Sequence, residues 1–190
     1  MPGSRLLGTT LASTTLTAAL LLGSAADGRA TRDRPPPGYT GGFGEPSCTQ
    51  CHIDARANDG VGSLTVAGLP ASYDPGATYT IVVTLTQPGL LAGGFELAVR
   101  FRDGAQAGSL RTADSTRIDV TTLEGVQYIH HLYDGTEPVA ADTARWQFEW
   151  TAPAPAAPVI MHVAANASDG DSSPLGDFIY ATSAQAAPEK

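Results

Sequence analysis

The sequence predicts an all-β domain built as a β-sandwich of about eight strands, with a closed barrel as the alternative. After position 59, short runs rich in β-branched and aromatic residues are separated by Gly, Pro, Asp and Asn at regular intervals, which is typical of all-β domains. One run alternates strictly, with Trp146, Phe148 and Trp150 on one face of a strand and Gln147 and Glu149 on the other. No segment in this part of the sequence has the apolar period of about 3.6 residues that a helix requires.

The first 30 residues have the features of a cleaved secretory leader. Arg5 provides a short positive start, an apolar stretch covers 6–22, and small residues up to Ala30 offer cleavage sites. An uncleaved membrane anchor fits less well, because several Thr and Ser residues interrupt the apolar stretch. No later stretch approaches the roughly 20 apolar residues needed to cross a bilayer. We therefore expect an exported chain with no integral membrane span after cleavage.

Residues 31–60 are expected to form an arm rich in Pro and Gly. Its 35–38 stretch is stiff and extended, 41–44 is loose, and a short helical turn is expected within 51–57. The β-sandwich is then expected over 61–183, followed by a small polar tail over 184–190. Strands are predicted at 62–66, 78–86, 94–101, 117–120, 126–133, 145–151, 159–165 and 177–181.

The arm contains the strongest chemical motif of the chain, Cys48-Thr49-Gln50-Cys51-His52. A C-x-x-C-H sequence is the attachment motif of c-type haem: two thiols bond the two vinyl groups and the adjacent imidazole ligates the iron. We therefore predict one covalently attached haem c, with Cys48 and Cys51 as thioether residues and His52 as the proximal axial ligand. A haem on such an arm would pack on one edge of the β-domain and stay partly exposed.

Two other interpretations of the motif are open. In an oxidising compartment the two cysteines could form a disulfide or a redox-active pair. However, a thioredoxin-like pair belongs to a helix after a strand, and this one follows an arm rich in Gly and Pro. Half of a zinc site is the other option, but zinc needs further ligands and the chain has only two cysteines.

A second iron ligand must come from the β-domain if the iron is six-coordinate. The candidates are His130, His131, His162 and Met161. On a strand, His130 and His131 point to opposite faces, so one of the two can face a given haem. Met161 falls on the face of apolar neighbours and is more typical of a core residue. The adjacent histidine pair is therefore the preferred source of the distal ligand.

Charge and the remaining motifs mainly exclude functions. The net charge of −8 disfavours nucleic acid and anionic membranes as partners. Asp169, Asp171 and Asp177 lie in a loop that lacks the spacing and closing Glu of a calcium-binding EF-hand loop, so a solvated acidic turn is the simpler interpretation. No G-x-S-x-G elbow marks a hydrolase nucleophile. We expect no enzyme activity of this kind.

Five segments, in this order, carry a resemblance to a known family: 44–52 (GEPSCTQCH), 73–79 (YDPGATY), 94–97 (GFEL), 146–153 (WQFEWTAP) and 163–180, which contains VAANASDG and GDFIY. Together they resemble the Reeler-type (reelin N-terminal-like) domain in its bacterial form, also called the choice-of-anchor V domain. The resemblance spans about 41–180 and implies an immunoglobulin-like β-sandwich. It also favours His131 over His130 as the distal ligand, because the family pattern has a His before a short polar turn like 134–136.

These features lead to one expected function and two alternatives. The expected function is an exported bacterial monohaem c-type cytochrome, in the periplasm, on the cell surface or outside the cell. It would pass single electrons to redox partner proteins, with self-association through sheet edges as a further option. The alternatives are a haem enzyme or gas sensor with an open distal site, and a haem-free binding or adhesion module in which the two cysteines form a disulfide.

Overall fold

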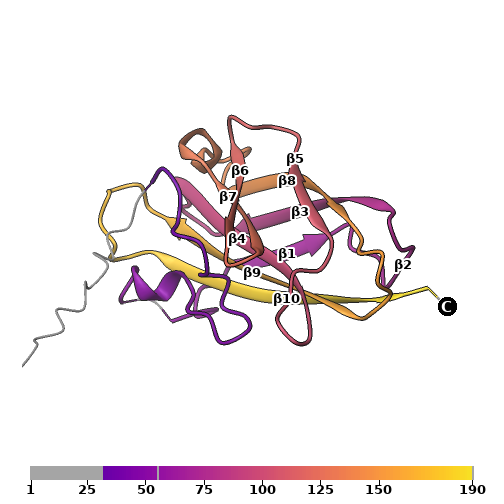
Figure 1. The fold of residues 1–190 in the computed structure, drawn as a ribbon. Helices are drawn as coiled ribbons and strands as arrows, with labels where there is room; N and C mark the ends of the chain where they lie inside the picture. Colours follow the sequence, from indigo (N-terminus) through magenta and orange to yellow (C-terminus); the bar gives the residue numbers. More distant parts are fainter. Residues whose placement is uncertain (1–31, 55, 190) are drawn as a thin grey trace, which may run out of the picture.

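The computed structural model describes residues 32–54 and 56–189 and shows a sandwich of two β-sheets (Figure 1). The four-stranded sheet has the order β1 (Ser63–Ala67), β3 (Thr78–Thr86), β8 (Thr143–Thr151) and β5 (Ser109–Thr112). The six-stranded sheet has the order β2 (Ser72–Tyr73), β10 (Phe178–Pro188), β9 (Val159–Ser168), β4 (Ala92–Phe101), β7 (Val126–His131) and β6 (Ile118–Leu123). All paired strands are antiparallel except β2, which is parallel to β10. The predicted all-β sandwich is confirmed.

Each of the eight predicted strands is present. Strand β3 has the predicted bounds, the other seven have shifted ends, and β2 and β5 are additional. Strand β7 ends at His131 because a 3₁₀ turn, η2 (Tyr133–Thr136), follows it. Strand β10 continues to Pro188, so most of the residues expected as a tail pair with β9 and β2 instead. The predicted leader, 1–30, lies outside the described residues. Within the part that the structure describes, no helix is long and apolar enough to span a membrane.

The core lies between the two sheets and confirms the alternation predicted for β8. Trp146, Phe148 and Trp150 are all buried, and Trp146 stacks on Phe95 of β4 with ring centroids 4.5 Å apart. Each tryptophan also donates a hydrogen bond, from Nε1 of Trp146 to the Gly135 carbonyl (2.8 Å) and from Nε1 of Trp150 to that of Ala107 (3.0 Å). The large aromatic surfaces are therefore buried without leaving a polar atom unpaired.

The arm, indigo to purple in Figure 1, packs on the outer face of the six-stranded sheet. Strand β4 is buried on both faces as a result. Glu96 on its outer face accepts hydrogen bonds at Oε1 from the backbone N–H groups of Gly38 (2.7 Å) and Tyr39 (2.8 Å). Gly42 lies directly on His162 of β9, where a Cβ atom would be 2.1 Å from the imidazole Cγ.

A buried charged cluster fixes the middle of the arm to the same sheet. Glu45 of the arm forms an ion pair with Arg100 of β4 and accepts a hydrogen bond from the Tyr128 hydroxyl of β7 (2.6 Å). After the cysteines, the arm is attached again, because Asn58 donates its backbone N–H to the Ile179 carbonyl of β10 (2.7 Å). The arm is thus anchored on both sides of the C-x-x-C-H motif.

Candidate functional site

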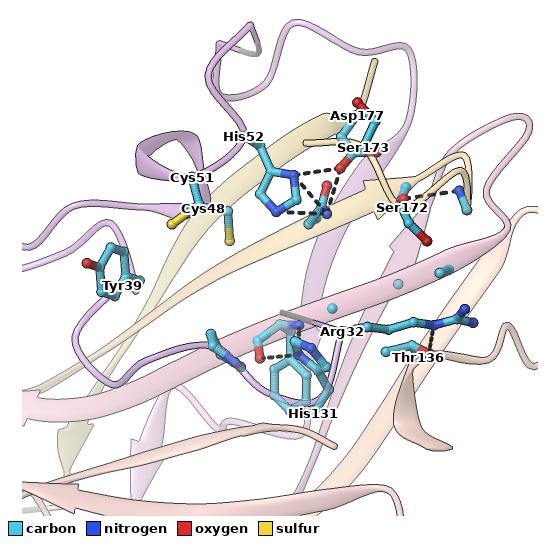
Figure 2. Close-up of a pocket in the computed structure, with 18 of the residues that line it drawn as sticks. Arg32, Tyr39, Cys48, Cys51, His52, His131, Thr136, Ser172, Ser173 and Asp177 are labelled. Atoms are coloured by element: carbon cyan, nitrogen blue, oxygen red, sulfur yellow. Dashed lines mark hydrogen bonds and ion pairs between the residues drawn. The ribbon is translucent and has the colours of Figure 1, made fainter. Parts of the chain in front are cut away.

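A pocket lies between the arm and the end of the six-stranded sheet where β4, β7 and β9 meet. Its lining includes Cys48, Cys51 and His52 from the arm and His131 from β7. Figure 2 shows Cys48, Cys51 and His52 on one wall and His131 on the opposite wall. Four residues selected from the sequence alone therefore share one pocket.

A 3₁₀ turn, η1 (Cys48–Gln50), presents the motif to the pocket. Ser47 caps this turn through its hydroxyl, which accepts from the Thr49 backbone N–H (3.4 Å), and the His52 N–H bonds to the Cys48 carbonyl (3.0 Å). The helical turn was expected within 51–57, and that prediction is wrong: the turn covers 48–50, directly after the capping residue Ser47. Because the chain curls here, both sulfurs and the imidazole face the same space (Figure 2).

The two thiols are free in this structure. Burial, together with the Glu96 carboxylate, raises the pKa of the Cys48 thiol to about 12. Redox-active C-x-x-C cysteines have the opposite property, a lowered pKa that keeps the thiolate available. The local environment of Cys48 is thus unlike that of a thiol–disulfide exchange site.

The imidazole of His52 is held by β9 and by the loop before β10. Its Nδ1 lies 2.6 Å from Oδ2 of Asp177, and the Asn166 side-chain amide donates to that same oxygen (3.1 Å). Burial acts to raise the pKa of Asp177, but hydrogen bonds from His52, Asn166 and Ser168 outweigh it and hold that pKa below its usual value. With Nδ1 engaged, Nε2 is the nitrogen that remains for a ligand in the pocket.

His131 approaches the pocket over a strand segment that lacks side chains. A Cβ atom on Gly94 would be 2.7 Å from Cε1 of the His131 ring, so glycine is required there. Nδ1 of His131 lies within 3.2 Å of the Phe95 carbonyl and 3.0 Å of its N–H. Burial lowers the pKa of His131 to about 4. The ring is therefore neutral near pH 7, as an iron-ligating imidazole must be.

The other ligand candidates lie elsewhere. His130 is fully buried, with Nε2 2.9 Å from the Thr121 hydroxyl and Nδ1 3.0 Å from the His131 carbonyl. His162 is covered by the arm and contacts the edge of the Phe43 ring, and Met161 is fully buried in the core. None of the three is among the residues that line the pocket.

The pocket also contains groups that fit the periphery of a haem. Arg32 lies at its lining, with Nε donating to the Thr136 hydroxyl (3.3 Å) and its guanidinium over the Tyr133 ring (5.0 Å). Among the described residues, no three or more His, Cys, Asp or Glu side chains are arranged to hold a metal ion. Two cysteines with an adjacent histidine, and a second histidine on the opposite wall, are the donor types that a c-type haem uses.

Sequence reasoning missed three contributors to this pocket: Asp177, Asn166 and Gly94. The sequence pattern places Asp177 in the acidic loop. Its contact with His52 bridges 125 positions of the chain, so spacing alone does not reveal it. Asn166 and Asp177 do fall in the 163–180 segment, and Gly94 opens the 94–97 segment. That segment pattern was the one available signal.

The fold and the pocket together define a Reeler-like β-sandwich with a pocket under its N-terminal arm. The Reelin-N domain of F-spondin matches with a TM-score of 0.50 and 20% identity, over 75% of this chain and 99% of that domain. The human F-spondin reeler domain matches with a TM-score of 0.49 and 18% identity, over 71% and 94%. A cohesin module of a Clostridium perfringens family 33 glycoside hydrolase reaches 0.49 and 12%, over 68% and 98%. No family model and no curated protein sequence matches the chain. The predicted Reeler-like fold is supported at the level of the fold alone.

Proposed function

We propose that this chain is an exported monohaem c-type cytochrome that carries single electrons outside the cytoplasm. Export follows from the leader-like residues 1–30, and the haem from the C-x-x-C-H motif. The observation that carries the proposal is the shared pocket: Cys48, Cys51 and His52 line it from the arm, and His131 lines it from β7.

Each of these residues has a defined role in the proposal. Cys48 and Cys51 would bind the haem covalently, His52 would be the proximal ligand and His131 the distal ligand. Arg32 provides a cation that would pair with a haem propionate. A bound haem supplies a one-electron couple between ferric and ferrous iron, and the protein positions it and sets its potential.

The position of His131 favours an electron carrier over an enzyme or gas sensor. A second protein ligand fills the site that a substrate or gas would need. Electrons would then leave through the exposed side of the haem at the pocket mouth, toward a redox partner protein. Self-association, which would bring haems of different copies together, is a further part of this proposal and requires scattering measurements at several concentrations.

The test is expression with the cytochrome c maturation machinery, followed by intact mass and visible spectra. We expect the mass of one covalent haem, which is lost in a Cys48→Ser, Cys51→Ser double variant. The ferrous wild type should be low-spin and unchanged by CO. His131→Ala should bind CO, whereas the matched control His130→Ala should not.

Three other results would contradict the proposal in distinct ways. A colourless wild type with a Cys48–Cys51 disulfide would establish the haem-free module. A haem protein that binds CO in its wild-type form would establish the open-site alternative. CO binding by His130→Ala but not by His131→Ala would exchange the roles of the two histidines.

A further inference from the structure

The two imidazoles of the pocket have different partners behind them. Nδ1 of His52 contacts a carboxylate, Asp177, whereas the hydrogen-bond partners of His131 Nδ1 among the described residues are the backbone N–H and carbonyl of Phe95. The partner on the second nitrogen of a metal-ligating histidine fixes its tautomer and orientation, and a carboxylate makes the ring a stronger electron donor than a carbonyl does. The proximal side is therefore the more electron-rich one.

The Asp177 carboxylate is buried, which strengthens its effect on His52. The side chain of Asp177 is 1% exposed and that of His52 is 14% exposed. Water screens a charge weakly in such a place, so the full negative charge acts on the ring across 2.6 Å. No charged partner of opposite sign other than His52 itself is paired with Asp177 among the described residues.

Asn166 holds the carboxylate in this position. Its amide nitrogen donates to Oδ2 of Asp177 (3.1 Å), the same oxygen that contacts His52. The nitrogen also lies 3.2 Å from Nε2 and 3.4 Å from Nδ1 of His52. These nearly equal distances place the amide beside the ring and not along the Nε2 lone pair. The direction in which Nε2 would bind a ligand is thus left open by Asn166.

The group is shielded from solvent, since Oδ1 of Asp177 and Oδ1 of Asn166 are both buried. Burying a carboxylate costs free energy of desolvation, which a neutral side chain in the same place would largely avoid. A link between the arm and β10 would not require a charge, since a neutral side chain could provide it.

From this geometry we infer that Asp177 is a positioning residue that fixes the proximal imidazole of His52 and lowers the midpoint potential of the haem, with Asn166 as its clamp. The inference rests on the proposed function, because it concerns the ligand of the proposed haem. A carboxylate bonded to Nδ1 gives the imidazole partial imidazolate character, which stabilises ferric iron more than ferrous iron. Nothing in the sequence spacing of His52 and Asp177 indicates this role.

The test compares Asp177→Asn with Asp54→Asn in the full-length haem protein, by potentiometric titration followed in the visible spectrum. Asp177→Asn keeps the size of the side chain and an acceptor oxygen but removes the charge. Asp54 is the matched control: it also links the arm to the loop before β10, since Oδ2 accepts the Gly176 N–H (2.8 Å), and it is exposed. We expect Asp177→Asn to change the ferric–ferrous equilibrium at least tenfold toward ferrous, a rise of about 59 mV for one electron, and Asp54→Asn to change it less than threefold.

Equal shifts of the midpoint potential in the two variants would overturn the inference, and so would a lower potential for Asp177→Asn. In either case the proposed function would still stand, because the wild type would still carry covalent haem. If Asp177→Asn fails to fold, the wild type alone decides the question through ¹⁵N-labelled histidine in the ferrous state. We expect a slowly exchanging, strongly downfield Nδ1–H signal for His52. A His52 Nδ1–H that exchanges with water as fast as an exposed histidine would overturn the inference. A wild type without haem would remove the proposed function and this inference together.

Discussion

Glu96 offers a quantitative test of how the arm is attached to the β-domain. Its Oε1 accepts the backbone N–H groups of Gly38 and Tyr39, whereas Oε2 is buried without a partner. Burial raises the pKa of Glu96 from its ordinary value of 4.5 to about 7, and the two N–H donors only partly oppose this. An acid with a raised pKa binds its proton more tightly in the folded state, so the folded state loses stability as pH rises from about 4.5 through about 7.

The magnitude follows from the size of that shift. Each pKa unit corresponds to about 1.4 kcal/mol, so a shift from 4.5 to about 7 amounts to about 3 kcal/mol. Glu96→Gln removes the ionisation but keeps an oxygen for Gly38 and Tyr39. At pH 8 the variant should therefore exceed the wild type in free energy of unfolding by about 3 kcal/mol, and at pH 4.5 the two should be nearly equal.

The assay is urea unfolding of the full-length protein followed by far-UV circular dichroism at pH 4.5, 6 and 8. Glu137→Gln is the control, because it removes the same charge from an exposed position, where a surface substitution changes stability by less than about 0.5 kcal/mol. A stability difference between Glu96→Gln and wild type that is the same at all three pH values would refute the reasoning. So would a Glu96→Gln variant that is less stable than wild type at pH 8.

Further predictions concern residues that shape the pocket or were candidates for it. Gly94→Ala should displace the His131 ring, because the new Cβ would lie 2.7 Å from Cε1. We expect the variant to retain covalent haem and its ferrous form to bind CO. A visible spectrum that does not change when CO is added would contradict this prediction. Met161→Leu should leave the visible spectrum unchanged and lower the free energy of unfolding by less than about 1.5 kcal/mol, because Met161 is a buried core residue. A change in the spin state of the iron would show instead that Met161 is a ligand.

The elements with strict alternation were predictable because their pattern depends on one buried face. Strand β8 is the clearest example, since Trp146, Phe148 and Trp150 all enter the core. Strand β2 was not predictable: it has two residues and exists because it pairs with the end of β10. The burial of both faces of β4 also depends on a distant segment, the arm, which the local sequence of β4 does not contain.

The sequence predicts the residues proposed as haem ligands, but it does not predict the side chains that contact them. The C-x-x-C-H motif is local, so its chemistry can be inferred from five adjacent residues. The choice between His130 and His131 needed a resemblance, because both are equally able to ligate iron. Asp177 and Asn166 became visible only when the fold placed β9 and the start of β10 beside His52.

The attachment of the arm has a consequence for how a haem would be held. One proposed ligand, His52, belongs to the arm, and the other, His131, belongs to the sheet, so a haem bound by both would require the arm to stay docked. Glu96 and Glu45 fix the arm before the motif and Asn58 fixes it afterwards. Because these contacts do not involve the cofactor, the pocket is preorganised by folding and little ordering is left for haem binding. A preorganised site also limits structural change between ferric and ferrous states, which favours electron transfer. The contacts that hold the arm on the sheet are therefore as much a part of the proposed function as the proposed ligands themselves.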